Sequence, residues 1–203
     1  MATLTTTSKL DAVNSILIGI GEAPVNTLGS GLQEAEIAEV ILDNVSREVQ
    51  SRGWTFNTDI RKTLPKNSDG YINLPSNYLK VDTTTLLRDY DTDVVERDRR
   101  LYDRITNSFV FTDDIVTDVV VLLDFDGLPE VARRYITLRA SRKFQENLLG
   151  SQTLSQLQAD EEQSAFIALL QSEGEIGDYN IFDHYDTYRH VDRSISTSTS
   201  TLI

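Results

Sequence analysis

Two histidines are the first candidates for chemistry, because imidazole transfers protons near neutral pH and binds metals. His184 and His190 are the chain's only histidines, and they lie close to its C-terminus. Their separation of six residues does not place them on one face of a helix, and their acidic neighbours are single aspartates. We therefore interpret both as polar contacts of a docking segment, and we expect no metal site and no cofactor.

The sequence contains no cysteine, which excludes disulfides, thiolate metal sites and cysteine nucleophiles. Asp124 and Asp126 resemble the start of a calcium-binding loop. However, counting from Asp124, loop positions six and twelve hold Pro129 and Tyr135 instead of glycine and glutamate. We predict a strand-to-helix turn here, with Asp126 capping the helix that follows.

Phosphate binding and nucleophilic catalysis also lack their usual sequence signals. The glycines at positions 19, 21, 29 and 31 match neither a Walker motif nor a dinucleotide fingerprint, and there is no Gly-x-Ser-x-Gly elbow. Acidic pairs such as Glu161 and Glu162 are frequent, as on a solvated face. We therefore predict that the chain is not an enzyme. The alternative is a hydrolase with two carboxylates facing each other across a cleft.

The charge balance argues against nucleic-acid binding. The chain has 32 acidic and 19 basic residues and a formal net charge of -13, so it repels phosphates. The one local basic cluster alternates with acidic residues: Arg97, Arg99, Arg100 and Arg104 with Glu96, Asp98 and Asp103. We predict an ion-pairing surface there. An acidic lumen past which DNA slides fits the net charge, and so does plain solubility.

Apolar residues at helical spacing predict two helices early in the chain. Ser8 is a suitable N-cap for the first, with Asp11 in its first turn, and Gly19 and Gly21 end it. The second helix is expected over residues 32–52, with Gly53 at the C′ position. The apolar positions are Leu10, Val13, Ile16, Leu17 and Ile20 in the first helix, and Ala35, Ala38, Ile41, Leu42, Val45 and Val49 in the second.

The periodicity changes to short strands and turns between Trp54 and Phe125. Strands are expected at 54–60, 71–74, 79–81, 101–105, 109–111 and 119–123. The last of these has the continuous apolar pattern of a central strand buried on both faces. We interpret Trp54 and Phe56, at the boundary between helix and strand, as core residues that join the two parts of the chain.

Helices return after Gly127, and Pro129 suits the first turn of a helix that is expected to reach residue 149. A fourth helix is expected over residues 154–171, ended by Gly174. The apolar positions are Ala132, Ile136, Ala140 and Phe144 in the third helix, and Leu154, Leu157, Ala165, Leu169 and Leu170 in the fourth.

This order of elements predicts an α+β fold. Residues 8–53 and 127–174 are expected to form one antiparallel four-helix bundle from both halves of the chain. Residues 54–126 form an inserted antiparallel β subdomain, and residues 175–203 form an extended C-terminal docking tail. No apolar run approaches the length of a membrane span, about 20 residues, and there is no secretory signal. We therefore expect no membrane contact, and a protein made in the cytoplasm or in a particle assembled there.

The docking tail carries more aromatic side chains than a disordered segment usually does. The predicted docking residues are Tyr179, Ile181, Phe182, Tyr185 and Tyr188, which alternate with aspartates and histidines. We expect these side chains to bind a partner. The alternative is that the tyrosines dock back on the chain's own helices.

Several stretches of the sequence, spanning about residues 8–170, are similar to one family. The most specific stretch is Arg52-Gly53-Trp54-x-Phe56-Asn57. The others include Leu10-Asp11-Ala12-Val13-Asn14, Ile20-Gly21-Glu22-Ala23-Pro24-Val25, Gly70-Tyr71-Ile72-x-Leu74-Pro75 and Ala140-Ser141-Arg142-Lys143-Phe144-Gln145. Through these residues the chain resembles the tail tubular protein A family, the head-to-tail adaptors or gatekeepers of short-tailed bacteriophages (podoviruses).

The resemblance implies a structural role in the virion, for a helical bundle that carries a β subdomain. Such proteins assemble as a dodecameric ring beneath the portal protein and above the tail nozzle, which tail tubular protein B forms. Tail fibres attach near this junction, and DNA passes through the lumen during ejection without specific binding. The docking tail would then contact the portal or a neighbouring subunit. The alternatives are a connector of another tail type and a virion-associated cell-wall hydrolase.

Overall fold

A computed structural model describes residues 5–83, 92–148 and 152–176 of the chain. Helix α1 (Lys9–Gly19) begins at a capping box, in which the Asp11 N–H donates to Ser8 Oγ and the Ser8 N–H donates to the Asp11 carboxylate. The hydrogen bonds from Ser8 hold the pKa of Asp11 below its usual range. The helix ends at Gly19, and Gly21 follows with a φ of 87°. Both predicted ends of the first helix are confirmed.

Helix α2 (Gln33–Gln50) buries the predicted stripe from Ala35 to Val49, with Ile41 partly buried. It ends two residues earlier than expected, and Ser51 is its C-cap. Gly53 therefore lies at C″ and not at C′. It still needs to be glycine, because its φ is 76° and an added Cβ would lie 3.0 Å from the Val120 side chain.

Helices α3 (Glu130–Leu148) and α4 (Gln152–Ile176) follow the β region. Helix α3 buries the four predicted residues Ala132, Ile136, Ala140 and Phe144 completely. Helix α4 continues through Gly174, so the prediction that this glycine ends it was wrong. Leu170, expected in the core, is 47% exposed, because the buried stripe of α4 runs through Ala165 and Leu169.

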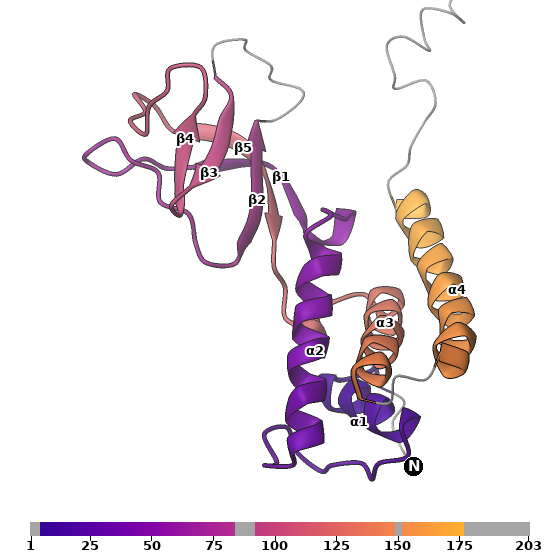
Figure 1. Ribbon diagram of the computed structural model, residues 1–203. Helices are drawn as coiled ribbons and strands as arrows, with labels where there is room; N and C mark the ends of the chain where they lie inside the picture. The colour runs from indigo at the N-terminus through magenta and orange to yellow at the C-terminus, as the bar shows by residue number, and fades with distance from the viewer. Residues whose placement is uncertain (1–4, 84–91, 149–151, 177–203) are drawn as a thin grey trace, which may run out of the picture.

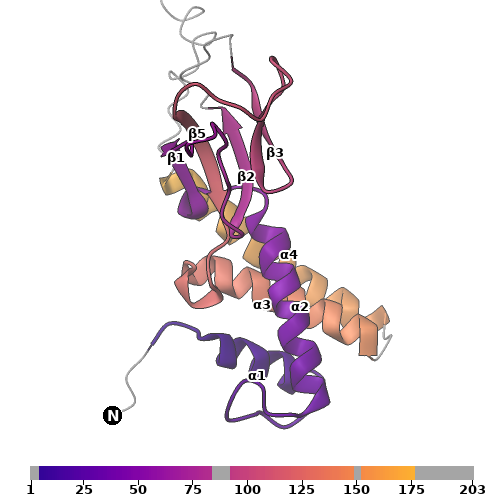
Figure 2. The same ribbon diagram turned by 90° about the vertical axis from the view of Figure 1, so that its left-hand side faces the viewer.

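The helices from the two halves of the chain share one hydrophobic core. Helix α3 packs against α1, α2 and α4, so it is the central member of the group. In both Figure 1 and Figure 2, α1 crosses the lower end of α2 steeply. The structure therefore confirms an α+β fold with four helices, and it does not confirm their alignment as an antiparallel bundle.

The β region contains a three-stranded antiparallel sheet of β1 (Thr58–Leu64), β5 (Ile115–Val121) and β2 (Tyr78–Thr83), in the order β1-β5-β2. The prediction that the valine-rich strand is central is confirmed. A hairpin of β3 (Val94–Arg97) and β4 (Arg100–Asp103) packs beside β2. A second hydrophobic core lies between these strands and the loops. The division into a helical part (residues 8–53 and 127–174) and an inserted β subdomain (residues 54–126) stays a prediction.

Three expected strands differ in the structure. Trp54 precedes a short 3-10 turn, Thr55–Asn57, and β1 begins only after it. The segment around Tyr71 makes a single bridge, between Asn73 and Arg100, instead of a ladder. Residues 109–111 form no strand within the described part of the chain. Hydrophobic packing accounts for the apolar pattern in the last two segments, because Ile72, Leu74 and Phe111 are buried in the second core although neither segment forms a continuous strand.

Strand β1 contains a bulge between Asp59 and Lys62, where the register against β5 shifts. Arg61 takes a φ of 57° there, and its N–H donates to the Asp118 carboxylate at 2.9 Å. The Lys62 ammonium pairs with the Asp59 carboxylate at 2.6 Å. The bulge therefore places charged side chains along an edge strand of the sheet.

A buried amide connects the helical and β parts. The Gln50 side chain is fully buried; its Nε2 donates to Leu123 O at 3.0 Å and its Oε1 accepts from Leu123 N at 2.8 Å. Asn57 Nδ2 donates to Gln50 O and to Val121 O, both at 3.0 Å. The Trp54 indole N–H donates to Val49 O at 2.7 Å. These bonds fix the end of α2 against the end of β5, where the β region meets the helices in Figure 1.

The substitution Gln50→Met should lower the free energy of unfolding by about 2 kcal/mol, because it leaves the N–H and C=O of Leu123 buried without partners. Urea denaturation followed by circular dichroism measures this loss. The matched control is Gln33→Met at an exposed position of the same helix, where we expect a change within about 0.5 kcal/mol. Equal effects of the two substitutions would contradict a bridging role for Gln50.

Candidate functional site

The predicted docking residues Tyr179, Ile181, Phe182, Tyr185 and Tyr188 lie outside the described residues, as do both histidines. Helix α4 ends at Ile176, so residues 175–176, predicted to be part of the extended docking tail, belong to this helix instead. Glu173 fixes this end of α4: its carboxylate accepts from the N–H of Thr55 at 2.5 Å and from the Thr55 hydroxyl at 3.0 Å. The tail therefore starts close to the junction that contains Trp54.

Asp126 does cap a helix, but a different one from the helix predicted. Its carboxylate accepts from the N–H of Lys9 at 2.7 Å, at the first residue of α1. Its backbone carbonyl accepts from Arg133, whose guanidinium also donates to Leu128 O and Thr7 O, both at 2.7 Å. The turn before α3 therefore attaches the N-terminal helix to the second half of the chain, a long-range contact that local sequence spacing does not reveal.

The basic cluster forms ion pairs only in part. Arg99 pairs with Glu96 at 2.9 Å, and Arg104 pairs with Asp93 at 3.2 Å. Arg97 lies instead over the ring of Tyr102, 3.8 Å from the centroid, and Arg100 lies over the ring of Phe109 at 4.8 Å. Two of the four arginines therefore form the predicted ion pairs, and the other two form cation–π contacts.

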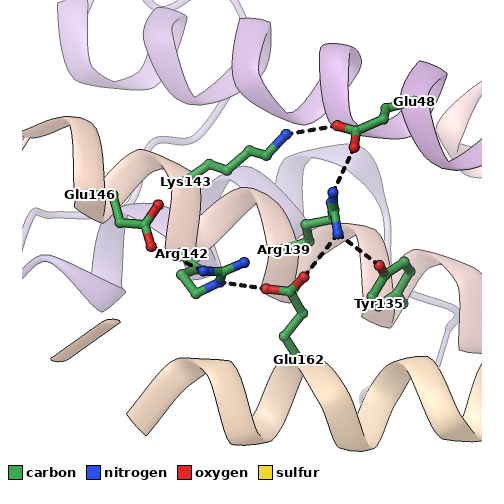
Figure 3. A network of polar contacts seen from close by, with 7 residues as sticks. All are labelled: Glu48, Tyr135, Arg139, Arg142, Lys143, Glu146 and Glu162. Carbon is green, nitrogen blue, oxygen red and sulfur yellow. Dashed lines mark hydrogen bonds and ion pairs between the residues drawn. The ribbon is translucent and has the colours of Figure 1, made fainter. Parts of the chain in front are cut away.

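A cluster of polar side chains joins α2, α3 and α4. We call it the arginine–glutamate network: Glu48, Tyr135, Arg139, Arg142, Lys143, Glu146 and Glu162 (Figure 3). At its centre, the Glu162 carboxylate accepts from Arg139 Nη1 at 3.1 Å and from Arg142 Nε at 2.5 Å. Only 10% of the Glu162 side chain is exposed. One carboxylate from α4 thus pairs with two guanidinium groups of α3.

The network continues from α3 to α2. The Glu48 carboxylate accepts from Arg139 Nη2 at 2.6 Å and from Lys143 Nζ at 2.7 Å. Arg139 Nη1 also donates to the Tyr135 hydroxyl at 3.0 Å. The hydrogen bond from Lys143, together with the bond and charge of Arg139, holds the pKa of Glu48 below its usual range. The bond to Glu162 raises the pKa of Arg142.

The sequence reasoning missed this network. Arg139, Arg142 and Lys143 recur at spacings of three and four, which places them on neighbouring positions of one helix. That spacing was a usable signal. Their glutamate partners come from other helices, so the pairing itself depends on tertiary contacts.

The ion pairs of the network join three helices, α2, α3 and α4. Within the described ranges, no group of three or more His, Asp or Glu residues is placed to hold a metal ion. The Glu48 carboxylate is held by two cations, which disfavours the protonated form that a general acid needs. A helix long and apolar enough to cross a membrane is also lacking among the described helices.

Replacing Glu162 with glutamine should lower the free energy of unfolding by about 2 kcal/mol, because two partly buried guanidinium groups lose their shared anion. Chemical denaturation of the purified chain measures the change. Glu161→Gln is the control, since Glu161 is the exposed neighbour on the same helix, and its loss should stay below about 0.5 kcal/mol. A loss for Glu162→Gln as small as that of the control would show that the network contributes little.

Stability should also fall in acid. Because the pKa of Glu48 is lower in the folded chain, its contribution is fully present above the unfolded value of about 4.3 and disappears as the pH falls below that value, through the folded one. Denaturation midpoints between about pH 7 and 3 measure this slope. The Glu48→Gln variant should lose less stability over the same acid range than the unaltered chain, and an identical slope would contradict the assignment.

Comparison with known proteins points to one family. The model of the family described as tail tubular protein matches residues 10–179. The chain is also 30% identical, over 142 residues, to tail tubular protein A of Klebsiella phage KP34, and the alignment covers 70% of this chain and 74% of that protein. Because the match includes all four helices and the β region between them, the chain belongs to the tail tubular protein family, which are structural proteins of the phage tail.

Proposed function

We propose that the chain is a head-to-tail adaptor of a short-tailed phage, and that it forms a dodecameric ring between the portal protein and the tail nozzle. The observation that carries the proposal is the family match over residues 10–179. The name of the KP34 relative is consistent with it. The subunit is made in the host cytoplasm and acts in the virion, where the nozzle (tail tubular protein B) and tail fibres are its further partners.

A ring subunit needs a rigid body and two different faces, because each copy contacts its neighbours head to tail. The arginine–glutamate network supplies rigidity, since it holds three helices together through ionised groups. The outer side of α4 supplies one candidate face, where Ile167 and Leu170 are 46% and 47% exposed and lie one helical turn apart. These two side chains would be covered by the next copy in the ring.

The docking tail is proposed to bind the portal or a neighbouring subunit in the assembled ring. Its aromatic residues are of the types that carry binding energy at protein interfaces. The net charge of -13 supports a lumen that DNA passes without binding, because like charges prevent phosphate contacts from forming. The tail begins beside α4, so the same end of the subunit would carry both the apolar face and the docking residues.

The hydrolase alternative needs a carboxyl group whose pKa is raised, so that it can donate a proton. In the part of the chain that the structure describes, each carboxyl pKa that is shifted moves downward, at Asp11, Glu48, Asp103 and Glu130. This supports a structural role. The connector of another tail type has no observation in its favour beyond the shared helical architecture.

Mixing the purified chain with its portal ring should give a complex of twelve copies on one portal, detected by native mass spectrometry. The triple substitution Tyr179→Ser, Phe182→Ser and Tyr185→Ser should weaken the affinity for the portal at least tenfold, because three aromatic anchors are lost. The control replaces three exposed apolar side chains of the β region with serine: Ile60, Ile105 and Val110, which are 68%, 50% and 54% exposed.

Each other outcome would change a different part of the proposal. Binding that survives the tail substitutions would keep the adaptor and move the interface to α4. A different copy number would overturn the dodecamer alone. If the folded chain does not bind the portal at all, the adaptor proposal fails.

A further inference from the structure

A pocket of about 290 Å³ lies beside the arginine–glutamate network, between the end of α2 and the facing sides of α3 and α4. Its charged lining consists of Arg52, Arg139, Arg142 and Glu162. Its aromatic lining consists of Tyr135 and Phe166, whose ring centroids are 5.1 Å apart. Figure 3 shows Tyr135, Arg139, Arg142 and Glu162 between α3 and α4.

The cations of this pocket are incompletely balanced. Within the network, three glutamates face three cations, because Glu48, Glu146 and Glu162 pair with Arg139, Arg142 and Lys143. Arg52 is additional. Its guanidinium lies over the ring of Phe166, with the guanidinium carbon 5.3 Å from the ring centroid. In addition, Arg139 Nε is buried without a hydrogen-bond acceptor in the described part of the chain.

This chemistry favours an acidic peptide that also carries aromatic side chains. An arginine stacked on a ring keeps its N–H groups available for a carboxylate, so Arg52 can bind an aspartate without leaving Phe166. The edges of Tyr135 and Phe166 can accept another ring, as aromatic pairs do at centroid distances of about 5 to 7 Å. A ligand of this kind would neutralise the extra charge and fill the apolar part of the pocket together.

The chain itself contains such a segment immediately after α4. Residues 177–188 include three aspartates, four aromatic residues and no lysine or arginine. The aspartates are Asp178, Asp183 and Asp186, and the aromatic residues are Tyr179, Phe182, Tyr185 and Tyr188. Its charge is therefore complementary to that of the pocket.

The distance also fits. Phe166 lies ten residues before the end of α4 at Ile176, which is about 15 Å along the helix axis. An extended chain covers this distance in about five residues, so residues 181–186 reach the pocket when the segment turns back along α4. A short tether gives a local concentration of about a millimolar, which favours the chain's own segment over one from another molecule.

We propose that, in the free chain, residues 178–188 bind in this pocket of the same molecule, with their aspartates on Arg52 and their rings against Phe166 and Tyr135. The pocket is then a resting site for the docking tail, which assembly must release before the tail can contact the portal or a neighbour. The binding itself concerns the free chain, so it holds or fails independently of the proposed ring.

The sequence permits a direct test in the full-length chain. Trp54 is the only tryptophan, and its ring is 6.5 Å from that of Phe166. Because the chain has no cysteine, Thr187→Cys gives a single labelling position inside the segment. An acceptor of tryptophan emission attached there should show strong energy transfer from Trp54. The same unlabelled variant provides the reference lifetime for each measurement.

The transfer should be unchanged on dilution and on adding an excess of unlabelled chain. It should fall by more than half in Arg52→Glu and in the double variant Asp183→Asn with Asp186→Asn. The control is Arg47→Glu, an exposed arginine of α2 outside this pocket, which should leave the transfer intact. Circular dichroism checks that each variant is folded.

Two results would overturn the proposal. Transfer that falls when unlabelled chain is added would mean that the segment binds a second copy. Weak transfer, or strong transfer that Arg52→Glu does not change, would mean that the segment does not bind through this pocket.

Discussion

The position of the β region relative to the helices depends on the buried amide of Gln50. This side chain replaces, at the end of α2, the hydrogen bonds that the chain leaving β5 would otherwise make with another strand. Asn57 and Trp54 make similar side-chain-to-backbone hydrogen bonds, since each donates a side-chain N–H to a backbone carbonyl of α2. Burial of these amides away from water makes their geometry obligatory. Two hydrophobic cores that share few side chains can in this way keep a fixed orientation.

The arginine–glutamate network plays a corresponding role at the outer helices. Helix α4 packs on the core through Ala165, Phe166 and Leu169, and Glu162 adds its ion pairs to α3. At its far end, Glu173 binds Thr55 next to the amide contacts of the junction. Helix α4 therefore connects the network to the junction.

Much of this fold could be predicted from the sequence where a local rule decides the outcome. The Ser8 cap, the buried stripes of α1, α2 and α3, and the central β5 each follow from spacing within about twenty residues. The predictions failed where a distant residue decides. Helix α4 continues through Gly174 next to its contact with Thr55. Residues 55–57 form a 3-10 turn instead of the expected strand, where Asn57 Nδ2 donates to Val121 O, although Trp54 is buried in the core as predicted. The basic residues of the network on α3 recur at helical spacing, which the sequence shows. Their glutamate partners on α2 and α4 have no such pattern in the sequence. The candidate docking residues follow from composition alone.

The bulge in β1 has a consequence for solubility at high copy number. An open three-stranded sheet leaves unpaired N–H and C=O groups along its outer strands, and identical molecules can join through them into fibrous aggregates. In β1 the left-handed turn at Arg61 directs its N–H to Asp118, so that group is not offered to a foreign strand. The charges of Asp59 and Lys62 further oppose the approach of a second copy. In the proposed ring assembly, this edge would keep free subunits apart until another surface joins them.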